Sequence, residues 1–109
     1  MTSVLQVPVK ASPKAAARID ELGLRGAVDR MLDYAVQHLP ELDRIEITLV
    51  DRYELGEEPG LAIDAYSPRP FDPADTADRD LDRWMVAELP PETLQHVLLS
   101  YRRGLPRAG

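Results

Sequence analysis

Five aspartates lie within eleven residues in the second half of the chain, and they are the densest group of side chains that could do chemistry. Carboxylate oxygens suit calcium and magnesium, and the spacing Asp78-x-Asp80-x-Asp82 copies the opening of an EF-hand loop. The match then fails, because the sixth position of that loop requires glycine and the twelfth requires glutamate. Here those positions are Arg83 and Leu89. On a helix, moreover, residues two apart point about 200° apart, so these aspartates could not converge on one ion. We interpret them as charge that favours the start of a helix, and we predict no metal site.

Other catalytic patterns are also missing from the sequence. The two histidines, His38 and His96, lie far apart, and a shared metal site would need a carboxylate such as Asp64 as a further ligand. No serine lies in a G-x-S-x-G turn, and the chain has no cysteine. The glycines are scattered singly, so the loops that bind phosphates and dinucleotides are absent. The sequence therefore predicts neither a catalytic residue nor a cofactor.

Charge along the chain points instead to recognition of a partner. The net charge is −6, but residues 41–91 carry −9, whereas residues 1–40 carry +1 and residues 92–109 carry +2. Candidate partner-binding residues are the acidic group Asp51, Glu54, Glu57 and Glu58 and the basic end Tyr101, Arg102 and Arg103. The basic end could contact a partner, or it could pair with the acidic middle of this chain or of a second copy. Nucleic acid is not expected as a partner, because its phosphates require a basic surface.

Length and composition predict one domain. The 109 residues include 44% hydrophobic residues, enough for a modest core, and we expect residues 1–109 to form one domain. We expect residues 1–11 to be an N-terminal arm or edge strand, and residues 104–109 to be a flexible C-terminal tail. No apolar run reaches the ~18 residues of a membrane span, and the N-terminus lacks a signal-peptide core, so we predict a cytoplasmic protein. Arginine outnumbers lysine eleven to two and asparagine is absent, which is typical of a GC-rich bacterial genome.

Periodicity predicts three helices. Ser12 and Pro13 are typical of a helix start, and that helix should end near Leu22, before Gly23. A second helix is predicted from about Arg25 to Leu39, because its apolar residues fall on one continuous stripe at the helical period: Val28, Met31, Leu32, Ala35, Val36 and Leu39. A third is predicted over 76–89, capped by Asp72 or Asp75. We interpret its Trp84 as a core residue rather than as a surface for stacking a ligand.

Alternation predicts a hairpin over 44–52 and 61–66. One of its faces should pack on the helices, while the other shows Glu46, Thr48, Asp64 and Tyr66. Residues 92–103 fit a helix and a strand equally well, and a third strand would stabilise an otherwise marginal hairpin. The predicted fold is α+β, with a small antiparallel sheet of two or three strands and helices packed on one face.

Two functions are compatible with these features. The first is a non-enzymatic protein-interaction module, regulatory or accessory, that binds another protein or forms a homodimer. The alternative is a small metal-dependent hydrolase that uses Glu46 or Asp64, Tyr66 and a histidine on the open sheet face. The absence of a catalytic pattern and the uneven charge favour the first.

Overall fold

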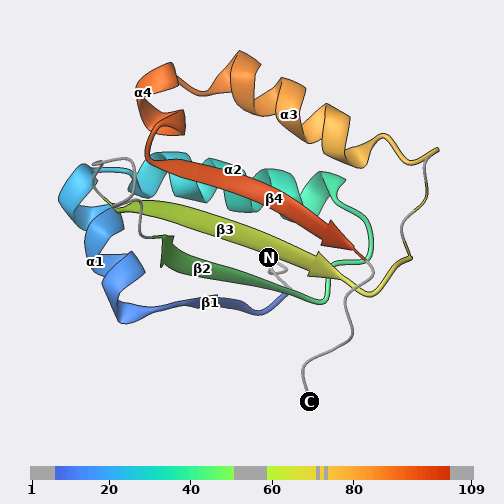
Figure 1. The fold of residues 1–109 in the computed structure, drawn as a ribbon, viewed down its shortest axis with the longest axis horizontal. Helices are drawn as coiled ribbons and strands as arrows, with labels where there is room; N and C mark the ends of the chain where they lie inside the picture. Colours follow the sequence, from blue (N-terminus) through green and yellow to red (C-terminus); the bar gives the residue numbers. More distant parts are fainter. Residues whose placement is uncertain (1–6, 51–58, 71, 73, 104–109) are drawn as a thin grey trace, which may run out of the picture.

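A computed structural model describes residues 7–50, 59–70, 72 and 74–103 of the chain (Figure 1). In this part of the chain, the elements follow one another in the order β1 (Val9–Ala11), α1 (Pro13–Leu22), α2 (Arg25–His38), β2 (Arg44–Val50), β3 (Gly60–Ser67), α3 (Ala77–Glu88), α4 (Pro91–Leu94) and β4 (Val97–Arg103). Helices therefore combine with a mixed sheet, and the predicted α+β class is confirmed.

The described strands form one four-stranded sheet in which the spatial order β1-β2-β3-β4 is also the order along the chain. The central pair β2–β3 is antiparallel, as the predicted hairpin requires, with Val50 opposite Gly60 next to the connecting loop. The outer strands pair in parallel, with Val9 opposite Ile45 in β1–β2 and Leu61 opposite Val97 in β3–β4. The predicted antiparallel sheet of two or three strands is therefore corrected to a mixed sheet of four. Parallel pairing needs a long crossover connection. The helices α1 and α2 connect β1 to β2, and α3 and α4 connect β3 to β4.

The first two helices form where the local signals predict. The Ser12 hydroxyl accepts a hydrogen bond from the amide of Ala15 at 3.1 Å, and Pro13 occupies the first turn of α1. Gly23 ends α1 in the left-handed region at a φ of 68°, which glycine adopts without the steric cost of a side chain. This turn sets the direction in which α2 leaves α1.

The ambiguous C-terminal segment divides into a short helix and a strand. Residues Pro91–Leu94 form α4, and Val97–Arg103 form β4. In β4, Val97, Leu99 and Tyr101 are buried while Leu98 is 43% exposed. A helix over the same residues would have buried Leu98 together with Val97. The strand forms because β3 has a free edge that β4 completes.

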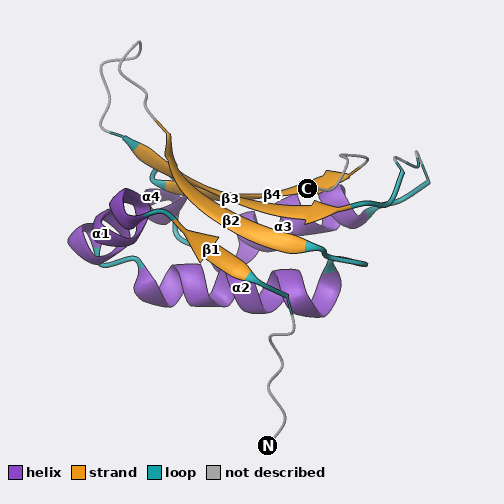
Figure 2. Ribbon diagram, turned by 90° about the horizontal axis from the view of Figure 1, so that it is seen from below, coloured by secondary structure: helices purple, strands orange, loops and turns teal. Residues whose placement is uncertain are grey.

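A hydrophobic core lies between the sheet and the helices. Figure 2 shows the helices of the described chain on the same side of the sheet, with the opposite face of the sheet left uncovered. Strand residues alternate accordingly, so that Ile45, Ile63 and Val97 are fully buried in neighbouring strands. From the helices, Ile19, Met31 and Leu81 fill the other half of this core. None of the described helices has both the length and the apolar character needed to cross a membrane.

Candidate functional site

The uncovered face of the sheet carries charged side chains at one end. The strand register aligns Arg44, Tyr66 and Arg102 in one row across β2, β3 and β4. The next row contains Glu46 and Asp64. Arg44 Nε donates a hydrogen bond to Glu46 Oε2 at 2.9 Å, and Arg102 Nε donates one to Asp64 Oδ1 at 2.9 Å. Each acid on this end of the face is therefore neutralised by an arginine of the neighbouring row.

Arginine also packs on the aromatic ring of this row. The Arg44 guanidinium carbon lies 4.1 Å from the centre of the Tyr66 ring, a distance typical of a cation–π contact. The hydrogen bond to Glu46 is the largest cause of a raised pKa of Arg44, and the hydrogen bond to Asp64 acts likewise on the pKa of Arg102. The hydrogen bonds behind these shifts join each arginine to a carboxylate of the neighbouring row.

The other end of the uncovered face is apolar. The row after the acids aligns Thr48, Ala62 and Leu98, and Val50 lies beyond it opposite Gly60. Leu98 is 43% exposed and Val50 is 40% exposed, which makes them two of the large apolar residues that the described structure leaves most exposed. The uncovered face is thus divided into a charged end and an apolar end.

The structure places the predicted recognition residues in different environments. Glu46, Thr48, Asp64 and Tyr66 are all on the uncovered face, as their alternation indicates. Asp51, Glu54, Glu57 and Glu58 lie outside the described residues. Of the basic end, Arg102 is half exposed and pairs with Asp64 on this face. The basic end was expected to contact a partner or to pair with the acidic middle of this chain or of a second copy. Arg102 pairs with the acidic middle of its own chain.

Tyr101 and Arg103 face the core side of the sheet. Tyr101 is 8% exposed, and its hydroxyl donates a hydrogen bond to the carbonyl of Pro40 at 2.6 Å. The Arg103 side chain is 4% exposed and donates hydrogen bonds to Asp75 Oδ2 at 2.8 Å and to Asp78 Oδ2 at 2.6 Å. These two residues therefore join β4 to the end of α2 and to the start of α3, and they are not presented to a partner in this structure.

Asp75 is the centre of that second cluster. Its Oδ1 accepts a hydrogen bond from the Ala77 amide at 2.9 Å, and its Oδ2 faces Arg103 and, at 3.4 Å, Arg69. The Ala77 amide is the main cause of a lowered pKa of Asp75, and the charges of Arg103 and Arg69 add to it. The cluster fixes the connection that leads into α3. The residue at the N-cap of α3 is Thr76 rather than Asp72 or Asp75, and Asp75 accepts the Ala77 amide from the position before the cap.

The histidines do not join the carboxylates of the uncovered face. His38 is exposed in the last turn of α2, on the helix side, whereas Asp64 is on the uncovered face. His96 precedes β4 and lies at the level of Gly60, four residues along the strand from Asp64. Within the described ranges, no group of three or more histidine, aspartate or glutamate residues could hold a metal ion. The geometry therefore gives no support to the metal-dependent alternative.

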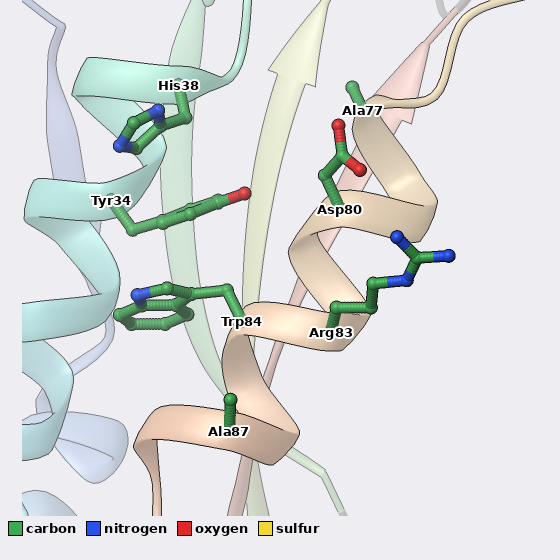
Figure 3. A pocket seen from close by; sticks show the side chains of 7 residues that line it. All are labelled: Tyr34, His38, Ala77, Asp80, Arg83, Trp84 and Ala87. Carbon is green, nitrogen blue, oxygen red and sulfur yellow. The ribbon is translucent and has the colours of Figure 1, made fainter.

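A second candidate site is a groove between α2 and α3 (Figure 3). The rings of Tyr34 and Trp84 bridge the two helices in a stacked arrangement, with centres 4.5 Å apart and planes inclined by 27°. His38 adds a third ring at 4.6 Å from Tyr34. Beside the rings the groove has a volume of about 520 Å³, lined by Tyr34, His38, Ala77, Asp80, Arg83, Trp84 and Ala87. A smaller hollow of about 230 Å³ continues it past the rings toward Arg30, Asp33 and Gln37.

Asp80 contributes the acidic side chain of this groove. Burial, with the negative charge of Asp80 adding to it, raises the pKa of Tyr34. In Figure 3 the hydroxyl of Tyr34 points toward Asp80, whereas the guanidinium of Arg83 points away from the rings. The groove therefore combines aromatic faces with a carboxylate.

The sequence did not reveal this groove. Trp84 was predicted as a core residue, and it does pack against the core, but it is only partly buried and its ring also lines the groove. The available signal was that Tyr34 and His38, four residues apart, share one face of α2, as Asp80 and Trp84 do on α3. Nothing in that spacing says that the two faces meet.

Comparison with models of known protein families, with curated proteins and with solved structures found no significant match in any of the three. The structure offers two candidate binding surfaces. One is the uncovered sheet face, with its apolar end around Leu98, and the other is the aromatic groove around Trp84.

Proposed function

We propose that this protein is a non-enzymatic protein-interaction module that forms a homodimer through the uncovered face of its sheet. The observation that carries the proposal is the pair of exposed apolar side chains Leu98 and Val50, in the row Thr48–Ala62–Leu98 and the row beyond it, on a sheet whose opposite face is packed against helices. Apolar area of this kind gains free energy when it leaves water, at about 25 cal/mol per Å². A regulatory or accessory role, a cytoplasmic location, a bacterial origin and a single domain over 1–109 stay predictions.

A second copy of the chain is the partner that fits this face best. A two-fold axis that runs across the strands at the apolar row would bring Leu98 of one copy against the partner's Leu98. The same axis would send the charged ends of the two copies to opposite rims of the interface. The arginines there already pair with Glu46 and Asp64 within each copy. Forming the interface therefore leaves no unpaired arginine charge at its rim. The arrangement is that of an apolar centre with a polar rim.

The size of the face sets the expected affinity. Three strands of seven or eight residues and the three-residue β1 at the edge, spaced about 4.8 Å apart, give a footprint of at most roughly 14 by 23 Å. That is a few hundred Å² for each copy, below the ~800 Å² per partner of a standard interface. We therefore expect a weak dimer that forms at tens to hundreds of micromolar and that dissociates on dilution.

Analytical ultracentrifugation between 5 and 500 µM tests this proposal. The unmodified protein should gain mass with concentration. Leu98→Lys, which puts a charge at the centre of the interface, should stay monomeric over the whole range. The matched control is Val86→Lys, because Val86 is 75% exposed on α3 and away from the sheet face, and it should dimerise like the unmodified protein.

Two results would contradict the proposal. One is an unmodified protein that remains monomeric at 500 µM. The other is a Leu98→Lys variant whose association is the same as that of the Val86→Lys control. In the second case the chain self-associates, but through a different surface.

A further inference from the structure

We propose that the groove between α2 and α3 binds the guanidinium group of an arginine side chain presented by another protein. The groove is lined by residues of α2 and α3 (Figure 3), and Figure 2 shows these helices on one side of the sheet, opposite to the face proposed for self-association. The inference is therefore independent of the homodimer, and either can fail without the other.

The aromatic rings are the first argument. Tyr34 and Trp84 are large rings that remain partly exposed, although each also packs against the core. Tyr34 lies between His38 and Trp84, so the ring face left for a ligand is the face of Trp84 that is turned away from Tyr34 (Figure 3). The faces of tryptophan and tyrosine carry negative charge density and attract cations, and arginine is the cation most often found over them because its planar guanidinium can stack. The uncovered sheet face uses the same contact within the chain, where Arg44 lies over Tyr66 at 4.1 Å. An arginine–tyrosine cation–π contact is therefore already present elsewhere in this chain.

The carboxylate is the second argument. Asp80 lines the larger hollow beside the rings, and its Oδ2 accepts a hydrogen bond from the Thr76 hydroxyl at 3.2 Å. A carboxylate can accept about four hydrogen bonds, so Asp80 keeps acceptor capacity for a guanidinium. Burial is the main cause of the raised pKa of Tyr34, and the negative charge of Asp80 adds to it.

Overall charge is the third argument. The chain carries −6, which favours the approach of basic rather than acidic partners. The two arginines that line the hollows do not reverse this preference locally. Arg30 is paired with Glu88, whose Oε1 lies 3.1 Å from Arg30 Nη2, and Arg83 is directed away from the rings (Figure 3). The larger hollow therefore offers an incoming cation the Trp84 ring and Asp80, with Arg83 as a nearby like charge.

A stacked guanidinium explains the shape of the groove as well. Ala87 lies one turn from Trp84 on the same helix, on the side of the ring turned away from Tyr34, and its short side chain leaves room there (Figure 3). Asp80 lies between Ala77 and Trp84 along this face. Trp84 and Asp80 line the same hollow, so a guanidinium bound there has an aromatic ring and a carboxylate within one site.

Trp84 is the only tryptophan of the chain, so its fluorescence reports directly on the groove. The probe is a short acetylated and amidated glycine peptide that carries two arginines. Controls are the same peptide with citrulline, which keeps the shape but lacks the charge, and with lysine. We expect a saturable change in Trp84 emission with the arginine peptide, and binding at least tenfold weaker with the citrulline peptide and several-fold weaker with the lysine peptide.

Two exposed residues of the groove provide opposite tests. Asp80→Asn should weaken binding of the arginine peptide about tenfold, because it removes the carboxylate and keeps the shape. Arg83→Gln should leave binding unchanged or make it tighter, because it removes a nearby positive charge. Both variants should keep the circular dichroism spectrum of the unmodified protein, since both side chains are exposed.

Several results would overturn the proposal. An arginine peptide that leaves Trp84 emission unchanged at millimolar concentration would do so, and so would citrulline binding of equal strength. Equal binding of the lysine peptide would show that guanidinium is not the recognised group. Tighter binding of a glutamate peptide that is lost in Arg83→Gln would show that the groove takes an anion instead.

Discussion

The turn between α1 and α2 allows one chemical change to be tested at two places with opposite expected signs. Gly23 has a φ of 68°, and an alanine there would be held in the left-handed region. Gly26 lies in the first turn of α2, where alanine is preferred. At both positions an added Cβ meets no described atom within 4 Å, so contacts do not enter the comparison. Any difference between the two variants therefore comes from backbone conformation.

The magnitudes can be set against each other. The left-handed region costs an L-residue about 1–2 kcal/mol, and replacing glycine recovers about 0.4–1 kcal/mol by restricting the unfolded chain. Gly23→Ala should therefore lower the free energy of unfolding by about 1 kcal/mol. Gly26→Ala should raise it by about 0.5–1 kcal/mol. For a chain of this size, the gap between the two variants corresponds to roughly 10 °C in Tm.

Urea unfolding followed by circular dichroism measures this difference. Gly23→Asn is a useful control, because asparagine tolerates the left-handed region better than alanine and should lose less stability. If both alanine variants shift the unfolding midpoint in the same direction, the reasoning from backbone conformation is wrong. The turn at Gly23 also orients α2, which carries Tyr34. We therefore expect Gly23→Ala to alter the groove around Tyr34 more than Gly26→Ala does.

Three further predictions concern the packing that holds the sheet to the helices. Tyr101→Phe removes the 2.6 Å hydrogen bond to the Pro40 carbonyl and should cost about 1 kcal/mol in chemical denaturation, so an unchanged midpoint would contradict it. Ile63→Ala empties a fully buried position on a central strand and should cost about 2–5 kcal/mol, whereas a loss below 1 kcal/mol would mean that the site is not in the core. Because the Ala77 amide and two arginines lower the pKa of Asp75 in the folded state, its contribution is complete above the ordinary pKa and disappears as the pH falls through the lowered one. Asp75→Asn should therefore flatten the decline in stability below pH 4, and a decline as steep as that of the unmodified protein would refute this.

Local patterns predicted the elements that local interactions determine. The helical stripe around Met31 and the capping pair Ser12–Pro13 were sufficient for α1 and α2, because period and caps are properties of a single segment. The alternation of 44–50 and 61–66 similarly identified the hairpin and its uncovered face, including Glu46 and Asp64.

Pairing between distant segments could not be predicted in this way. Residues 1–11 were expected to form an arm or an edge strand, but no local pattern shows that Val9–Ala11 pair in parallel with β2. The residues of β4 fit both the helical and the strand period, and they form a strand because they pair with the edge of β3. The groove was missed for the same reason, because Tyr34 and Trp84 are 50 residues apart and only the packing of α3 beside α2 makes them neighbours.

The agreement between chain order and strand order has a consequence for how the sheet forms and opens. Val50 and Gly60 are ten residues apart, whereas each parallel pair joins residues separated by 36 positions, Val9 with Ile45 and Leu61 with Val97. Short loops close faster than long ones, so we expect the hairpin to form first and the outer strands to add to it afterwards. In the folded protein the reverse applies, and the three-residue β1 should exchange its amide hydrogens fastest while β2 and β3 exchange slowest. The central pair β2–β3 would thus stay hydrogen-bonded while the outer strands unfold and re-form locally.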